Sequence, residues 1–259
     1  MKDSSPNPYL FFTGTASGRT SLNRFHSSFI IYSGSCLHLF DCGDGISKAL
    51  LNHKIDVTLI DSITVSHFHA DHICGLPSLL TQMKMNGRRK KLTIYTYEKE
   101  TENLRSFITQ TYLFIQRLPY KVIIHGFRQN EDFYPDPGIR IVSRPTSHLQ
   151  KYRSEDTGGS LSFYCSSFLI DVNGKRIHYT GDIASADDLS IFSDMNPDIV
   201  ISEFAHITRE ELEDFVSSFR GEIILTHYDD GAPALYYENT TGERPASPLF
   251  ATDGYILNL

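Results

Sequence analysis

The chain has 259 residues and a formal net charge of −7. This length allows one large domain or two small ones, and we predict a single domain over residues 1–259. The acidic balance argues against a general polyanion-binding surface, because affinity for a phosphate backbone depends on clustered Lys and Arg. No apolar stretch approaches the roughly 20 residues of a membrane span and no signal peptide is evident, so a cytoplasmic protein without membrane partners is expected.

Hydrophobic patterns predict short strands and helices that alternate along the chain. We expect strands over residues 9–13, 29–32, 36–40, 63–65, 92–97, 121–126, 140–143, 163–172, 176–180, 222–226 and 255–257. We expect helices over residues 46–52, 71–85, 100–116 and 209–219. Asn173-Gly174 is typical of a hairpin turn. Hairpins mixed with strand–helix alternation favour an α/β protein with mixed sheets.

Four metal-binding side chains lie within six residues: His67, His69, Asp71 and His72. His67 and His69 follow an apolar strand and are two residues apart, so on an extended backbone they point to the same side. Burying four such groups without a metal or other partners would cost several kcal/mol. The cluster therefore predicts a metal site, in which one cation could use His67 and His69 and another could use Asp71 and His72.

Three further candidates follow predicted strands elsewhere in the chain: His148, Asp182 and His227. Loops at strand ends are common places for functional sites, so we expect these residues to join the cluster. The remaining histidines lack this context and are interpreted as structural or exposed; they are His26, His38, His53, His125 and His178. We place His38 and His178 in mid-strand, where an outward-facing histidine is ordinary.

In this order and spacing, the candidate ligands resemble the metallo-β-lactamase fold superfamily, and within it the ribonuclease Z branch. The resemblance to that branch rests on Thr13-Gly14-Thr15-Ala16-Ser17-Gly18, Asp41-Cys42-Gly43-Asp44-Gly45 and Asp71-His72-Ile73-Cys74-Gly75-Leu76-Pro77. It spans nearly the whole chain. The resemblance implies an αββα sandwich of two mixed β-sheets flanked by helices, with metals at one edge of the paired sheets.

Carried over position by position, the resemblance implies two divalent ions. His67, His69 and His148 would hold one ion, the other residues would hold the second, and Asp182 would bridge both. That second group comprises Asp71, His72 and His227. The family metal is usually zinc, although ligands with nitrogen and oxygen donors leave manganese and iron open. Two such ions can share a hydroxide that acts as nucleophile, and Asp71 would also orient it.

Two departures from ribonuclease Z narrow the expectation. The family carries a long tRNA-binding arm between the positions of His148 and Asp182, which here lie only 34 residues apart. We expect strands to use most of that interval, so stable tRNA binding is not expected. The family's His-Glu-Ala-Thr segment reads Ser202-Glu203-Phe204-Ala205-His206 here. Glu203 aligns and would orient a histidine, whereas His206 would either replace the missing proton donor or have a supporting or surface role.

The leading hypothesis is a metal-dependent hydrolase that cleaves a small or flexible phosphodiester, such as a short nucleotide. A glyoxalase II-like thioesterase or a lactonase could use the same ligands, although residues 239–259 offer glutathione a single Arg244. A catalytically silent, metal-binding regulatory protein is the non-enzymatic alternative. A homodimer is open, because relatives commonly form one. Residues 228–248 could be a lid or a surface connection, and Arg88–Lys91 a solvated loop or a contact for a phosphate-bearing substrate.

Overall fold

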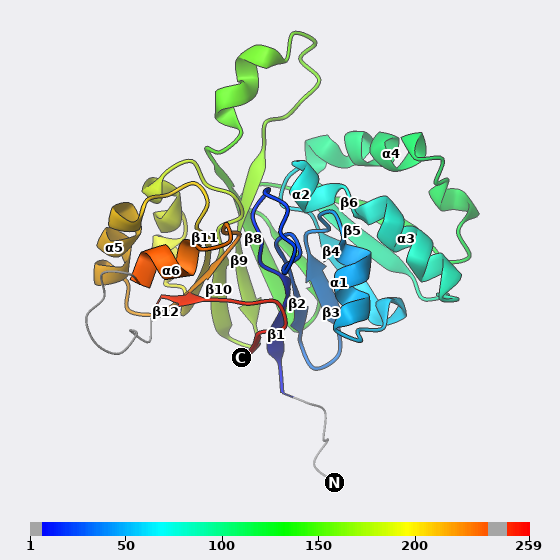
Figure 1. Cartoon of the computed structure of the whole chain (residues 1–259). Coiled ribbons are helices and arrows are strands. Elements are labelled where there is room, and N and C mark those ends of the chain that lie inside the picture. Colours follow the sequence, from blue (N-terminus) through cyan, green and yellow to red (C-terminus); the bar gives the residue numbers. More distant parts are fainter. Residues whose placement is uncertain (1–6, 238–247) are drawn as a thin grey trace.

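The computed structural model describes residues 7–237 and 248–259. Two mixed seven-stranded sheets, counted over these residues, pack face to face with helices on their outer faces (Figure 1). This arrangement confirms the predicted αββα sandwich. The two sheets share one pattern: three antiparallel pairs at one side are followed by three parallel pairs at the other.

The first sheet has the strand order β14-β1-β2-β3-β4-β5-β6. Its strands are β1 (Tyr9–Gly14), β2 (Ser28–Tyr32), β3 (Leu37–Phe40), β4 (Ile60–Thr64), β5 (Leu92–Tyr97), β6 (Val122–Phe127) and β14 (Ile256–Asn258). The second sheet has the order β13-β12-β11-β10-β9-β8-β7. Its strands are β7 (Asp132–Asp136), β8 (Ile139–Thr146), β9 (Cys165–Val172), β10 (Lys175–Tyr179), β11 (Ile199–Glu203), β12 (Glu222–Thr226) and β13 (Leu249–Phe250).

The core between the sheets is rich in aromatic side chains. Phe29 stacks on Phe40 with ring centroids 4.7 Å apart and meets Tyr179 edge-on at 4.9 Å, which joins the first sheet to the second.

Outer layers complete the sandwich. The helices are α1 (Ile46–Asn52), α2 (Ala70–Ile73), α3 (Leu76–Met85), α4 (Thr101–Gln110), α5 (Arg209–Ser218) and α6 (Ala232–Tyr237). Short 3-10 helices cover 57–59, 98–100, 115–117, 150–155, 186–190 and 193–195. This packing fixes the strand ends that carry the candidate site.

The helix predicted over residues 71–85 is wrong as one element, because the chain breaks it into α2 and α3. Gly75 lies between them and packs tightly against the turn after β3. A Cβ atom at Gly75 would lie 2.1 Å from the carbonyl oxygen of Gly43, and the Gly75 amide donates to the Cys42 carbonyl at 2.9 Å. The break lets Asp71 and His72 stand on a separate short helix beside the other candidate ligands.

The helix predicted over residues 100–116 is also too long. α4 ends at Gln110, and Tyr112 has a φ of 60°, a left-handed conformation that an α-helix cannot contain. Residues 115–117 form only a 3-10 turn. The helical pattern of apolar residues continues to Ile115, past Tyr112, where the backbone leaves the helical conformation.

The expectation that strands fill most of the interval 148–182 is wrong. β8 ends at Thr146 and β9 begins at Cys165, so residues 147–164 form an excursion that projects beyond the sheets at the top of the molecule (Figure 1). Phe163, which we placed in the strand, has a φ of 54°, outside the range of a strand. We call residues 147–164 the excursion below.

His38 and His178 are not outward-facing, since both side chains are fully buried. His38 hydrogen-bonds through its two ring nitrogens to Ser62 at 2.6 Å and Thr64 at 2.9 Å, and His178 Nε2 lies 2.7 Å from the Ser167 hydroxyl. Burial lowers the pKa of each histidine to about 3. Both are therefore neutral parts of the fold.

The segment 228–248 is only partly described. Residues 232–237 form α6, which packs on the second sheet, and residues 238–247 lie outside the described residues. Whether a lid covers the cleft stays a prediction. Among the described helices, none has the length and apolar character needed to cross a membrane.

Candidate metal centre

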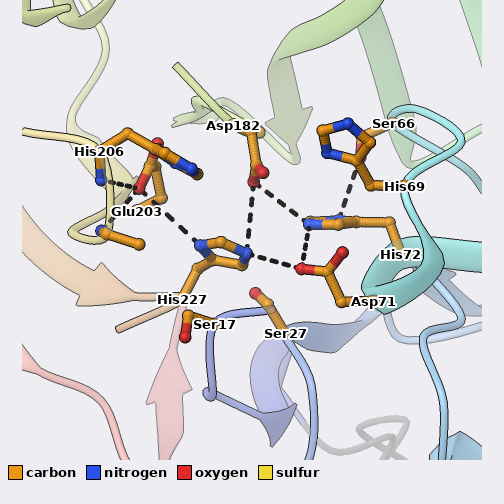
Figure 2. Close-up of polar contacts among 12 residues, drawn as sticks. Ser17, Ser27, Ser66, His69, Asp71, His72, Asp182, Glu203, His206 and His227 are labelled. Carbon is orange, nitrogen blue, oxygen red and sulfur yellow. Dashed lines mark hydrogen bonds and ion pairs between the residues drawn. The ribbon is translucent and has the colours of Figure 1, made fainter. Parts of the chain in front are cut away.

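The seven predicted ligands converge at one edge of the sandwich because each follows the end of a strand. His67 and His69 lie in the loop after β4, and Asp71 and His72 lie on α2, which that loop leads into. The other three follow β8, β10 and β12 of the second sheet; they are His148, Asp182 and His227. Strand ends of both sheets thus bring together residues up to 160 positions apart (Figure 2).

Asp182 lies at the middle of the cluster and presents one carboxylate oxygen to each side. Its Oδ2 lies 3.6 Å from Nε2 of both His67 and His148. Its Oδ1 lies 3.2 Å from His72 Nε2 and 3.6 Å from His227 Nε2. The side chain is almost fully buried. The carboxylate therefore lies between two groups of candidate ligands.

The first ligand group is His67, His69 and His148, and the second is Asp71, His72 and His227. Within the first group, His148 Nε2 lies 3.3 Å from His69 Nδ1. Within the second, Asp71 Oδ2 lies 3.0 Å from His227 Nε2 and 3.5 Å from His72 Nε2. The donor atoms of the first group with Asp182, and separately those of the second group, lie within 4.8 Å of one another.

Hydrogen bonds to the remote ring nitrogens set which nitrogen faces the centre. Asp41 Oδ2 accepts from His72 Nδ1 at 3.0 Å, so a neutral His72 directs the lone pair of Nε2 toward the carboxylates of Asp71 and Asp182. The Ile183 carbonyl lies 3.2 Å from His148 Nδ1 in the same way. Such partners usually orient metal-binding histidines and raise their basicity.

Asp41 is the hub of this support and was not recognised as such from sequence, although it begins the Asp41–Gly45 motif. Its fully buried carboxylate also accepts from the Ser66 amide at 2.7 Å, the Ser66 hydroxyl at 2.9 Å and the Tyr179 hydroxyl at 2.8 Å. Ser66 in turn lies 3.0 Å from His67 Nδ1. One carboxylate thereby positions a histidine of each ligand group.

The donor set fits two metal ions. Several buried atoms that could bind a metal have no hydrogen-bond partner within the described part of the chain: Nε2 of His67, Nε2 of His72 and Oδ1 of Asp182. Lone pairs that face one another are costly unless a proton or a cation lies between them. Two ligands on a tetrahedral ion with bonds of about 2.0–2.1 Å lie roughly 3.3–3.5 Å apart, close to the separations around Asp182.

The electrostatics agree with a site built for cations. Burial lowers the pKa of His227, yet the carboxylate of Asp182, the hydrogen bond to Asp71 and the nearby carboxylate of Glu203 raise it overall to about 10. For His72, burial is likewise outweighed by Asp182 and Asp41, which leave its pKa well above the usual value. The carboxylates thus attract positive charge into the centre, as they would attract a metal ion.

Glu203 and His206 form a pair beside the ligand groups. Glu203 ends β11 and is buried, and its Oε1 lies 2.7 Å from His206 Nδ1. Its Oε2 accepts from the backbone amides of Ala205 and His206, at 2.7 and 3.0 Å, and lies 3.8 Å from His227 Nδ1. Glu203 therefore contacts His206 and faces a histidine of the second ligand group.

His206 lies at the wall of the centre rather than on the distant surface. Its ring centroid is 4.7 Å from that of His148 and 5.9 Å from that of His227. The hydrogen bond to Glu203 raises the pKa of His206, against the opposing effect of burial. A ring nitrogen of His206 also lies within 4.8 Å of possible metal-binding atoms of Asp182 and His227.

A small cavity opens onto the ligand groups. It has a volume of about 290 Å³ and is lined by His69, Asp71, Asp182, His206 and His227 together with Ser17, Gly18, Arg19, Ala205 and Asp229. The sequence did not reveal that residues 17–19 line the site, although Ser17 and Gly18 belong to the Thr13–Gly18 motif. Ser17 hydrogen-bonds to Asp229, and the exposed Arg19 guanidinium lies 3.5 Å from the same carboxylate.

The excursion contributes a second residue that sequence reasoning missed. The Tyr152 ring, 41% exposed, meets the His69 ring edge-on with centroids 6.0 Å apart. Lys151 Nζ lies 5.0 Å from the centroid of the Tyr152 ring. An aromatic face and a cation therefore stand beside the first ligand group, outside the cavity.

Comparison with known proteins identifies the family. The family model described as "Anti-Pycsar protein Apyc1" matches residues 8–244. The chain belongs to this family. Members of the ribonuclease Z group are also similar to the chain. Ribonuclease Z of Methanosarcina acetivorans is 40% identical over 263 aligned positions, which cover 86% of this chain and 84% of that protein.

Another similar protein, ribonuclease Z of Methanocaldococcus jannaschii, is 32% identical over 139 residues, or 54% of this chain. The match spans 44% of that protein, less than half of its length. The ribonuclease Z-like character expected from the motifs is thereby confirmed.

Solved structures share the fold. The metallo-β-lactamase fold protein YhfI of Bacillus subtilis superposes with a TM-score of 0.72 at 21% identity, covering 97% of this chain and 99% of that chain. A diphosphatase of the PhnP family gives 0.69 at 19% identity, covering 97% and 98%. Zn(2+)-bound PqqB of Methylobacterium extorquens gives 0.67 at 15% identity, covering 97% and 100%. At these identities the likeness establishes the metallo-β-lactamase fold.

Proposed function

We propose that this protein hydrolyses phosphodiester bonds in a small or flexible substrate, at the cavity beside the two ligand groups and with two divalent ions. The observation that carries the proposal is Asp182, whose two oxygens face different histidine groups. A bridging carboxylate between two such groups suits a pair of ions that act together on one bond.

The first ligand group with Asp182 would hold one ion, and the second ligand group with Asp182 would hold the other. Zinc is the proposed metal, because imidazole and carboxylate donors suit it, and manganese or iron are the alternatives. The structural neighbour PqqB is described as zinc-bound. When bound, the ions would supply a water activated at neutral pH and would offset charge on the phosphate oxygens.

The residues around the ions have separate tasks in this proposal. Asp71, on α2 at the cavity wall, would orient the attacking water as well as bind an ion. His206 would donate a proton to the departing oxygen from the ring nitrogen that Glu203 does not use. The raised pKa of His206, caused mainly by its hydrogen bond to Glu203, keeps this proton available near neutral pH.

The surroundings of the cavity support a small or flexible substrate. Its volume of about 290 Å³ lies just below the range of about 300–1,000 Å³ usual for small-molecule sites. Arg19 is the one arginine or lysine that lines it within the described residues, and we assign it to a phosphate oxygen. Tyr152 is placed to stack on a base or another flat group that leaves the cavity toward the excursion.

A substrate panel tests the proposal with zinc-loaded protein. We expect turnover of bis(p-nitrophenyl) phosphate, cyclic nucleotides or short RNAs, and its loss together with metal in His67→Ala. The exposed His125→Gln is the matched control and should keep both. Absence of turnover for every phosphodiester at full metal loading would revive the silent regulatory protein, and faster turnover of thioesters or lactones would favour those alternatives.

Stable binding of precursor tRNA is not expected, since the excursion is confined to residues 147–164. A homodimer and a cytoplasmic location stay predictions. Light scattering on the purified protein would test for the homodimer. Fractionation of cells that express the chain would test the cytoplasmic location.

A further inference from the structure

The basic run Arg88–Lys91, which could have contacted the substrate of the metal centre, is divided among three tasks in the structure. Arg88 is buried and donates to the carbonyl oxygens of Thr58, Lys90 and Lys91 at 2.8–2.9 Å. Lys90 forms an ion pair with Asp61. Arg89 is exposed and lines a cavity on the outside of the first sheet.

This cavity, which we call the basic pocket, has a volume of about 640 Å³. Three cationic side chains line it: Arg89, Arg105 and Lys121. The rest of its wall is uncharged and mixes polar with apolar groups; it consists of Ile115, Gln116, Leu118, Pro119, Tyr120 and Val122. No carboxylate is among the lining residues, although the whole chain carries a net charge of −7.

The positive charge of the basic pocket is poorly neutralised. Arg89 and Lys121 form no ion pair within residues 7–237 and 248–259, and Arg105 has one exposed partner, Glu102, at 3.6 Å. Below the wall, the buried guanidinium of Arg88 lies 5.4 Å from the ring centroid of Tyr120 and donates only to carbonyl oxygens. A buried cation without a carboxylate partner adds a fixed positive potential to that of the rim.

The basic pocket lies at the opposite end of the sheet from the metal centre. β4, β5 and β6 are parallel, and His67–His72 follow the end of β4. Arg89 instead precedes the start of β5, and Lys121 precedes the start of β6. A small substrate at the metal centre therefore cannot reach these cations, so any ligand of the basic pocket is a separate molecule.

We propose that the basic pocket binds a diphosphate group, either of a nucleoside diphosphate or of inorganic pyrophosphate. Arginine guanidinium groups suit phosphate oxygens because they donate paired hydrogen bonds, and Lys121 adds a compact charge. The apolar wall at Ile115, Leu118 and Val122 offers contact area for a nucleoside. This inference does not rest on the function proposed for the metal centre.

Isothermal titration calorimetry on the metal-loaded full chain tests the proposal with ADP, pyrophosphate and AMP as probes. We expect saturable binding of ADP or pyrophosphate and at least tenfold weaker binding of AMP. The double variant Arg89→Gln/Lys121→Gln should weaken binding at least tenfold. Lys48→Gln/Arg220→Gln removes the same charge from two exposed sites outside the pocket and should leave binding unchanged.

The His67→Ala variant separates this site from the metal centre, and it should retain the binding of the tight probe. Tighter ADP than pyrophosphate would assign a nucleotide, and the reverse order would assign the inorganic ion. The proposal is overturned if neither probe saturates at millimolar concentration, if the double variant binds normally, or if binding disappears in His67→Ala. An acidic peptide that binds the pocket where ADP and pyrophosphate do not would also overturn it.

Discussion

Glu203 Oε1 lies 2.7 Å from His206 Nδ1, and this contact holds the imidazole at the cavity wall beside both ligand groups. The carboxylate is 1% exposed, whereas the His206 side chain is 33% exposed. A buried anion thus stabilises a proton on a histidine that substrate can reach. The proposed proton donor, His206, therefore follows the end of β11, whereas the resemblance to ribonuclease Z implies a histidine at the position of Ser202.

Replacing His206 with glutamine tests this assignment. A positioned general acid contributes about 10²–10⁴-fold, so His206→Gln should lower kcat by that order for a dinucleotide, whose alkoxide leaving group needs a proton. The loss should be much smaller for bis(p-nitrophenyl) phosphate, because p-nitrophenolate departs without protonation. Steady-state kinetics with both substrates, and the metal content of the variant, provide the measurement.

The same comparison separates proton donation from metal binding. If His206 is a ligand instead, the variant loses metal and the two substrates suffer alike. Glu203→Gln should follow His206→Gln in its dependence on the leaving group, because it acts through His206.

Asp41→Asn should weaken metal binding without touching a ligand. Asp41 accepts from His72 Nδ1 and from Ser66, which adjoins His67. Removal of such an orienting carboxylate typically costs about 10–100-fold in metal affinity or activity. Competition with a chromophoric chelator measures the affinity. Asp44→Asn, in the same turn but exposed, is the control; equal affinities for both variants would show that Asp41 does not orient the site.

Arg19→Gln should raise KM for phosphodiesters about tenfold while kcat stays within a few-fold. Arg19 lines the cavity and is 79% exposed in its side chain, with Asp229 as its partner, so its loss removes a phosphate contact and leaves the fold intact. Initial-rate kinetics with a cyclic nucleotide give both constants. A fall in kcat at unchanged KM would show that Arg19 acts in the chemical step and not in substrate binding.

The two buried histidines make stability depend on pH. Burial lowers the pKa of His38 and His178 from 6.5 to about 3, so in the folded protein both stay neutral while the unfolded chain takes up protons below about pH 6.5. The contribution of the two neutral histidines to the free energy of unfolding is therefore fully present above about pH 6.5. It is lost as the pH falls from there toward 3. Each contributes up to about 1.4 kcal/mol per pH unit in this window.

Urea unfolding of metal-free protein between pH 7 and pH 4.5 measures this slope. His178→Gln should flatten it and keep a partner for Ser167, whereas His125→Gln, exposed on β6, should not change it. A slope that stays the same in His178→Gln would show that this histidine is protonated without penalty in the fold.

The ligands could be found from sequence because a strand end is a local signal. Apolar residues before His148, Asp182 and His227 mark where each strand stops. That these ends meet at one edge of two packed sheets was implied by the resemblance to the metallo-β-lactamase fold, not by the local pattern. The break at Gly75 could not be found in the same way, because it depends on the distant Gly43. The single domain boundary at 1–259 stays a prediction.

The burial of polar side chains could not be predicted from the sequence. His38 and His178 resemble outward-facing residues, since alternation along a strand does not reveal that their partners are Ser62, Thr64 and Ser167 in neighbouring strands. The support given by Asp41 and the presence of Tyr152 beside His69 likewise depend on contacts between distant segments. Such contacts carry no local signature.

Metal stoichiometry followed together with phosphodiesterase activity tests the central claim most directly. The chain should be stripped with a chelator and titrated with zinc while bis(p-nitrophenyl) phosphate hydrolysis and bound metal are recorded. We predict two ions per chain, with activity that returns as both sites fill and that Asp182→Asn abolishes. A chain that binds two ions but hydrolyses none of the phosphodiesters, or one that is fully active without metal, would contradict the account.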